Sequence, residues 1–346
     1  MRRLAALGAL AFLPGCTAIE YYAQAAGGHL EVMRRAVPIE ERLREPDTPD
    51  ALRAKLERAL AIREFASREL ALPDNGSFRR YADLGRPFVL WNVFAAPEFS
   101  VTPVESCFLF AGCVSYRGFY SEQAAQRDAA ALAREGYDVY IGGVPAYSTL
   151  GWFDDPVLST FIQYPETEVA RIVFHELAHQ VAYVKDDTAF NESFAATVEE
   201  EGVRRWLERE GTPAKLQAYE RMQGIRREFA AFMLKYRGRL AEFYGRPATP
   251  EEKRAGKQRI FSQMQDEYRM LKAAWGGFAG YDRLFAGGAN NALLASFAAY
   301  TELVPAFRAL LARKQNDLAA FYAAVRALAR SSKSERDAQL TDLARK

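Results

Sequence analysis

The chain has 346 residues, which is long enough for one large domain or two modest ones with a buried core. Apolar residues make up 49% of the sequence and aromatic residues 13%, and these proportions exclude wholesale disorder. The 46 basic and 44 acidic residues nearly cancel without forming a concentrated basic face, so we expect no nucleic-acid partner.

Residues 1–15 are typical of an export signal. The sequence MRR supplies a positively charged start, and a short apolar run follows from Leu4 to Leu13. This run is shorter than the roughly 20 residues that a transmembrane helix needs. We therefore expect no permanent membrane-spanning anchor in this segment.

The same segment ends in the sequence LPGC, which resembles the lipobox of bacterial lipoproteins. The resemblance implies that residues 1–15 are a lipoprotein signal peptide and that Cys16 receives lipid and becomes the first mature residue. It also implies more than one acyl chain, which stable membrane anchoring requires. Thr17 follows the cysteine in place of an acidic residue, which by resemblance implies a periplasmic protein on the outer membrane. The alternative is a plain signal peptide followed by an incidental cysteine.

The sequence up to residue 160 is expected to combine helices with an antiparallel sheet. Helical patterns cover residues 17–45 and 49–70, with Thr48 as the N-cap of the second helix. Between residues 78 and 120, short runs rich in Val, Phe, Tyr and Trp are broken by Pro and Gly, which predicts strands. A helix over residues 121–136 and a further strand over residues 137–143 follow.

Two cysteines besides Cys16 lie close together at Cys107 and Cys113. A tight turn between them would place them opposite each other on a hairpin, where paired Cα atoms approach to about 4.5 Å. Exported proteins retain disulfides, so we expect a structural disulfide between these residues. Two buried free thiols are the alternative.

Nearly all of the sequence beyond Pro165 has a helical pattern. A part with a sheet followed by a helical part predicts an α+β fold, in which residues 16–160 and 161–346 form one unit with a site at their junction. The expected helices cover residues 166–184, 189–210, 213–243, 250–275 and 290–329.

The pattern HELAH at residues 175–179 is the strongest chemical signal in the chain. On a helix, His175 and His179 lie one turn apart on the same side, so both imidazoles can reach one Zn²⁺ ion at about 2.0–2.1 Å. Glu176 lies beside that position, where it can take a proton from a water molecule. The chain has only 3 histidines, so two of them in this pattern are unexpected if their roles are purely structural.

A catalytic zinc site needs a third protein ligand and an open fourth position. No cysteine and no histidine follows His179, so the third ligand must be a carboxylate. Glu192 and Glu199 both qualify, because they lie on about the same face of the next predicted helix, seven residues apart.

The sequence around Glu192, NESFA, resembles the Asn-Glu-Gly-Phe-Ala of the neutral zinc aminopeptidases. Together with HELAH it resembles the gluzincins, the class that includes thermolysin, and this resemblance implies that Glu192 is the third ligand. The gap of 12 residues between His179 and Glu192 is shorter than in those families. It still allows one helix to end and the next to return.

The resemblance extends over nearly the whole chain. The sequences LPGC, AGCVSYRGFY, GVPAYSTLGWFDDP, HELAHQ, NESFA and NNALLASFAAY are similar to a family of bacterial lipoproteins that are predicted zinc aminopeptidases. The resemblance implies a zincin-like helical part, Zn²⁺ as cofactor and hydrolysis of periplasmic peptides. An envelope endopeptidase and a lipoprotein that binds zinc without catalysis are the alternatives.

Two further site elements follow from the same class. In gluzincins an exposed edge strand precedes the zinc helix and pairs with the substrate backbone, which by resemblance assigns substrate binding to the segment with Gly143 and Tyr147. An ordinary loop that packs Tyr147 and Trp152 into the core is the alternative. With no histidine left, a tyrosine is expected to stabilise the transition state, and Tyr300 is the candidate because a late helix could close over the site. The chain has 17 tyrosines, and a core or surface role for Tyr300 is the alternative.

Overall fold

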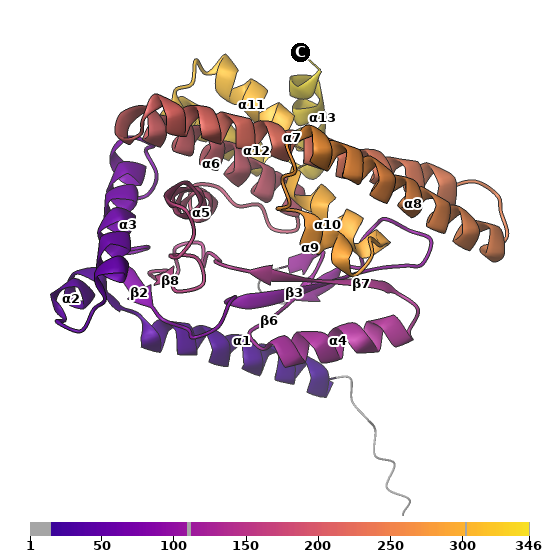
Figure 1. Ribbon diagram of the computed structural model, residues 1–346, viewed down its shortest axis with the longest axis horizontal. Coiled ribbons are helices and arrows are strands. Elements are labelled where there is room, and N and C mark those ends of the chain that lie inside the picture. Colours follow the sequence, from indigo (N-terminus) through magenta and orange to yellow (C-terminus); the bar gives the residue numbers. More distant parts are fainter. Residues whose placement is uncertain (1–14, 109–111, 302, 346) are drawn as a thin grey trace, which may run out of the picture.

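The computed structural model describes residues 15–108, 112–301 and 303–345. These residues form an α+β fold, as predicted, in which helices cover both faces of a small central sheet. Figure 1 shows α1 and α4 along one side of this sheet, with α5, α6 and α7 stacked on the other side. The bounds are α1 Gly15–Arg35, α4 Glu122–Arg134, α5 Glu166–His179, α6 Thr188–Glu210 and α7 Pro213–Tyr244.

The central sheet is antiparallel and has the order β6–β3–β7. The middle strand β3 pairs with both neighbours, so that Asn92 lies between Gly118 on one side and Gly142 on the other. Strand β7 is an edge strand of this sheet, where the sequence predicts a strand over residues 137–143. The bounds are β3 Leu90–Ala96, β6 Arg117–Phe119 and β7 Asp138–Val144.

Two smaller sheets accompany the central one, and one of them differs from the prediction. Strands β4 and β5 form an antiparallel hairpin, whereas β2 pairs antiparallel with β1 and parallel with β8. A parallel pair is possible here because a long crossover, including α4 and the central sheet, separates β2 from β8 in the sequence. The bounds are β1 Val37–Pro38, β2 Arg80–Ala82, β4 Ser106–Phe108, β5 Gly112–Val114 and β8 Val157–Leu158.

Side chains of β3 alternate between the two faces of the central sheet. Trp91 and Val93 pack against Ala125 and Ala129 of α4. Phe94 packs on the opposite face against Ala292 of α10, and by alternation Asn92 shares that face. Helix α10 covers only part of this face, so the remainder is left as the floor of a cavity.

The largest hydrophobic core joins the sheet-bearing and helical parts of the chain. Its buried residues extend from Val32 in α1 to Leu343 in α13, and they include Val169, Val173 and Leu177 of α5. Burial of α5 among other helices fixes the position of the pattern HELAH relative to the sheet. None of the helices in the described part of the chain is long and apolar enough to cross a membrane.

The helical part contains more breaks than its sequence pattern predicts. In place of one helix over residues 290–329 there are three. Pro305 lies in the first turn of α11, where its missing N–H is tolerated, and Gln315 and Asn316 have left-handed φ angles of 55° and 60° that end this helix. The bounds are α10 Asn291–Thr301, α11 Val304–Arg313, α12 Leu318–Arg330 and α13 Lys333–Ala344.

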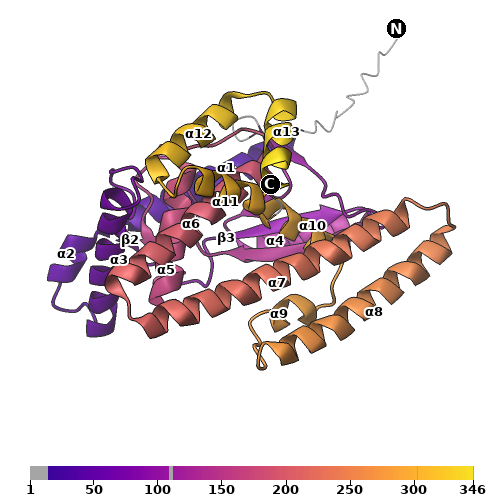
Figure 2. The same cartoon turned by 90° about the horizontal axis from the view of Figure 1, so that it is seen from above.

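Other helices lie at the edges of this arrangement. Helices α7 and α8 run side by side and extend beyond the central sheet (Figures 1 and 2). Pro49 is the N-cap of α3, whereas Thr48 donates its hydroxyl to the carbonyl of Arg42, so the predicted cap residue was wrong by one position. The bounds are α2 Ile39–Arg44, α3 Asp50–Arg68, α8 Pro250–Ala274 and α9 Asp282–Ala286.

Candidate metal and active site

The end of α5 and the start of α6 bring together His175, His179 and Glu192. The Nε2 atoms of the two histidines lie 3.2 Å apart. Glu192 Oε2 lies 3.2 Å from His175 Nε2, and Glu192 Oε1 lies 3.8 Å from His179 Nε2. Two imidazole nitrogens and a carboxylate therefore face one point.

These separations fit a tetrahedral metal site. Two ligand atoms that each lie 2.0–2.1 Å from a tetrahedral ion are about 3.3 Å apart. The distances between the two Nε2 atoms, and between His175 Nε2 and Glu192 Oε2, are close to that value. Lone pairs in such close contact repel each other unless a proton or a cation lies between them, and this donor set suits Zn²⁺.

Glu176 lies beside this point and lines the same cavity. Burial raises the pKa of its carboxyl to about 7, and the nearby charge of His175 offsets this effect only in part. A carboxyl group with a pKa near neutrality can both accept and return a proton. Glu176 therefore has the position and the proton affinity of a general base.

Glu199, the alternative third ligand in the sequence, has a different position. Its Oε2 lies 2.8 Å from Nδ1 of His175, the ring nitrogen that faces away from His179 and Glu192. Arg171 and this ring nitrogen already hold the Glu199 carboxylate, whereas the ligand atoms that lie within 4.8 Å of one another come from His175, His179 and Glu192. Burial would raise the pKa of Glu199, but Arg171, at 3.0 Å, and His175 together lower it to about 2.

The short connection between the two helices is held by side chains. Helix α5 ends at His179, five residues before the predicted end, and the chain then turns back into α6. The Asn191 side chain accepts from the N–H of Val184 and donates to its carbonyl, both at 2.8 Å. Asp187 caps α6 by accepting from the N–H of Phe190. These bonds explain how 12 residues suffice for the return.

A cavity of about 740 Å³ opens in front of these residues. Its floor is the uncovered face of the central sheet, and Tyr22 and Ala25 of α1 form part of its wall. Gly143 and Tyr147, the predicted substrate-binding residues, both line it. The structure therefore brings these two residues into the same cavity as the three predicted ligands.

The edge strand β7 directs backbone groups away from the sheet. Asn290 donates to the carbonyl of Val139 at 2.9 Å, so that carbonyl points away from β3. Backbone groups alternate along an antiparallel strand, so Ile141 and Gly143 also direct theirs outward. The outward groups of Gly143 lie at the cavity end of the strand, where an extended peptide can pair with them.

Three residues near the cavity were not predicted for the site. The hydroxyl of Tyr147 lies 2.7 Å from His29 Nδ1, although the sequence around His29 contains no recognisable motif. Tyr116 and Tyr183 line the cavity near Glu192. Tyr183 follows His179 by four residues, a spacing that could have indicated it. The side chain of Tyr300, the predicted transition-state residue, lies outside the described part of the structure.

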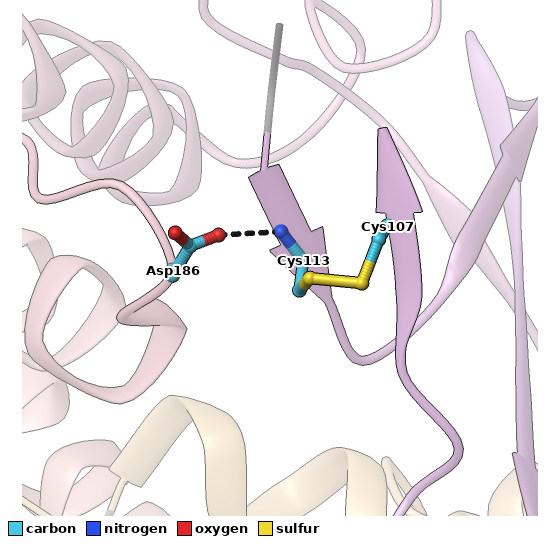
Figure 3. The surroundings of a disulfide bond; sticks show 3 residues. All are labelled: Cys107, Cys113 and Asp186. Atoms are coloured by element: carbon cyan, nitrogen blue, oxygen red, sulfur yellow. Dashed lines mark hydrogen bonds between the residues drawn. A yellow bond between two sulfur atoms is a disulfide. The ribbon is translucent and has the colours of Figure 1, made fainter. Parts of the chain in front are cut away.

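The disulfide hairpin contacts the connection between α5 and α6. Cys107 and Cys113 are joined in a disulfide between β4 and β5. The N–H of Cys113 donates to Asp186 Oδ1 at 2.5 Å, as Figure 3 shows. Asp186 belongs to the connection between α5 and α6, so the hairpin supports one wall of the site. Cys16, the predicted lipid acceptor, lies at the start of α1, and its side chain lies outside the described part.

Comparison with known proteins assigns the chain to a family. A family model described as "Putative aminopeptidase" matches residues 20–340, which is most of the chain. No curated protein and no solved structure is detectably similar to the chain. The family description indicates a peptidase, and therefore peptide substrates. The chain belongs to this aminopeptidase family.

Proposed function

We propose that this protein is a zinc-dependent aminopeptidase in which His175, His179 and Glu192 hold the metal. The observation that carries the proposal is the convergence of their three ligand atoms, all within 4.8 Å of one another, with Glu176 lining the same cavity. When bound there, zinc would supply Lewis acidity that makes water more acidic and polarises the peptide carbonyl.

Side chains of the protein would move the proton. Glu176 accepts a proton from the attacking water and returns it to the amine that leaves. Glu199 holds the His175 ring in position through Nδ1, which leaves Nε2 directed at the ligand cluster. The hydroxyls of Tyr116 and Tyr183 are the described candidates for stabilising the negative charge on the carbonyl oxygen.

The cavity would bind the substrate in an extended form. The outward backbone groups of Gly143 can pair with the substrate backbone, as other edge strands do with peptides. The hydrogen bond between Tyr147 and His29 of α1 holds the chain just after this strand in place. Substrates would be periplasmic peptides.

This location follows because we also propose that Cys16 is lipidated and anchors the protein to the outer membrane. Wild type should incorporate a radioactive fatty acid, and the variant Cys16→Ala should not.

The proposed function is tested with Glu176→Gln. The variant should keep one zinc per chain, because Glu176 is not a ligand, and should lose activity by about 100- to 10,000-fold, as expected for a missing general base. Metal analysis and peptide hydrolysis are measured on the same sample. Activity equal to that of the wild type would exclude the mechanism, and a wild-type protein without stoichiometric metal would exclude the zinc site.

One observation favours endopeptidase action as a second candidate. An aminopeptidase requires an acidic group to hold the free amine of its substrate. Among the described residues that line the cavity, the carboxylates are those of Glu176 and Glu192, which already have other roles. Aminoacyl reporters and internally quenched peptides of matched sequence distinguish the two, since an endopeptidase cleaves only the second kind.

A further inference from the structure

A second, smaller pocket adjoins the candidate active site. It has a volume of about 210 Å³ and shares Asn92, Gly143 and Val144 with the larger cavity. Its other walls come from the central sheet and from α10, and they consist of Phe94, Tyr140, Gly142, Ser296 and Phe297. The small pocket is therefore a recess of the cavity floor that ends against α10.

The recess exists because a glycine occupies a position on the floor of the sheet. Gly142 lies opposite Asn92 on β7, and Gly118 lies opposite Asn92 on β6. A Cβ atom built at Gly142 would meet a ring atom of Tyr140 at 3.4 Å, which is ordinary contact. A larger side chain at this position would therefore project into the recess, between Phe94 and Tyr140.

The walls of the recess favour an apolar guest. Phe94, Tyr140 and Phe297 contribute aromatic rings, and Val144 an aliphatic side chain. An apolar cavity of about 150 Å³ in another protein is large enough to bind benzene. A space of about 210 Å³ can accordingly take a side chain as large as that of leucine or phenylalanine.

Asn92 marks the junction between the recess and the main cavity. It is 6% exposed, and its Oδ1 has no hydrogen-bond partner among the described residues. A buried acceptor is normally paired, because leaving it unpaired is costly. This Oδ1 lies beside Gly118 of β6, on the side of Asn92 away from Gly142, so it adds no polar group to the recess.

We infer that this recess is a specificity pocket, which receives the apolar side chain of a substrate residue next to the cleaved bond. The inference rests on the proposed peptidase function. A peptide paired with β7 directs alternate side chains to each face of the sheet, and those on the face of Gly142 point toward the recess. The enzyme would therefore prefer leucine, methionine or phenylalanine over alanine at that position of the substrate.

The test narrows the recess without altering the metal ligands or Glu176. Gly142→Ala and Gly142→Val are compared with wild type on quenched peptides and aminoacyl reporters. In these substrates the residues on either side of the cleaved bond are Ala, Leu or Phe. A mismatch of about one methylene group between a side chain and an apolar pocket alters kcat/KM by about 10- to 200-fold. We expect a loss in this range for Leu and Phe on one side of the bond and little change for Ala.

A variant that enlarges the recess distinguishes a change in specificity from a folding defect, because misfolding would not raise activity toward any substrate. Phe297→Leu enlarges the recess and should raise the relative kcat/KM for Phe or bulkier side chains at the same substrate position. Gly238→Ala, on an exposed part of α7 with open space around it, is the matched glycine control and should match wild type. Zinc content and circular dichroism are measured for every variant.

The outcomes distinguish this inference from the proposed function. Equal losses for Ala, Leu and Phe substrates in properly folded, zinc-loaded Gly142 variants would overturn the specificity pocket, and so would unchanged kinetics in all variants. Failure of the proposed function has another signature, in which the wild type hydrolyses none of the peptides or Glu176→Gln is as active as wild type.

Discussion

Glu199 Oε2 lies 2.8 Å from Nδ1 of His175, and Arg171 holds the same carboxylate at 3.0 Å. When Nδ1 donates its proton to Glu199, the lone pair of the ring remains on Nε2, which faces His179 and Glu192. The relationship thus determines both the tautomer and the direction of one proposed metal ligand.

We predict that Glu199→Gln weakens zinc binding. Loss of such a supporting carboxylate lowers metal affinity by about 10- to 100-fold, because the ring is held less firmly and is a weaker base. Competition with a chromophoric zinc chelator measures the affinity. Glu201→Gln is the control, since Glu201 lies on the same helix but pairs with Arg204 and Arg205. Wild-type affinity in Glu199→Gln would remove the proposed role of this residue.

Arg336 of α13 and Asp187 at the start of α6 form a buried ion pair. Arg336 Nη2 lies 2.6 Å from Asp187 Oδ2, and both side chains are 4% exposed. We predict that Arg336→Met lowers the free energy of unfolding by about 3–5 kcal/mol, because the carboxylate remains buried and loses its main partner. Urea unfolding measures the change.

Two further variants complete this prediction. Asp187→Asn combined with Arg336→Met should recover part of the loss, because asparagine still caps α6 and carries no charge. Arg330→Met, at an exposed position in the last turn of α12, should unfold like wild type. If Arg336→Met lowers the free energy of unfolding by less than about 1 kcal/mol, the pair contributes no more than a surface ion pair does, and the prediction is wrong.

Asp155 gives a prediction for the pH dependence of stability. Burial raises the pKa of its carboxyl from 3.8 to about 6, and the hydrogen bond from the N–H of Thr149 opposes this only in part. Between pH 4 and pH 6 this carboxyl is ionised in the unfolded chain but still protonated in the folded protein. The free energy of unfolding therefore falls as the pH rises through this range. The difference between the two pKa values corresponds to a loss of about 3 kcal/mol in the free energy of unfolding above pH 6.

Asp155→Asn should remove this dependence. Asparagine imitates the protonated carboxyl, so the variant should gain stability relative to wild type between pH 4 and pH 6 and keep that advantage above pH 6. Urea unfolding at a series of pH values measures the difference between the two proteins. Asp47→Asn, at an exposed position before α3, serves as the control. If the free energies of unfolding of wild type and Asp155→Asn differ by the same amount at every pH, the pH dependence does not come from Asp155.

The disulfide between Cys107 and Cys113 gives a prediction for substrate binding. The double substitution of both cysteines by alanine should cost about 2 kcal/mol in stability, as expected for a short closed loop. It should also raise KM, because Val114 of β5 and Tyr116 just after it line the cavity. A phosphine reductant should reproduce the change in wild type but have no effect on the double variant. Equal KM values for both proteins would exclude support of the cavity wall by the hairpin.

Several features of the helical part could be predicted because they depend on neighbouring residues. Helices α7 and α8 begin at Pro213 and Pro250, as predicted, and Thr212 and Thr249 accept from backbone N–H groups at these starts. The end of α5 could not be predicted in the same way. It depends on bonds between Asn191 and Val184, which form only when α6 packs against α5.

The sequence by itself determined that His175, Glu176 and His179 share one helix, because helical periodicity acts over a few residues. Only the tertiary structure decided between Glu192 and Glu199 as the partner of both imidazoles, since that choice depends on where α6 begins relative to α5. The contact of His29 with Tyr147 and the recess above Gly142 were decided at the same level. Each joins segments far apart in the chain, whose separation is determined by packing and not by local backbone preference.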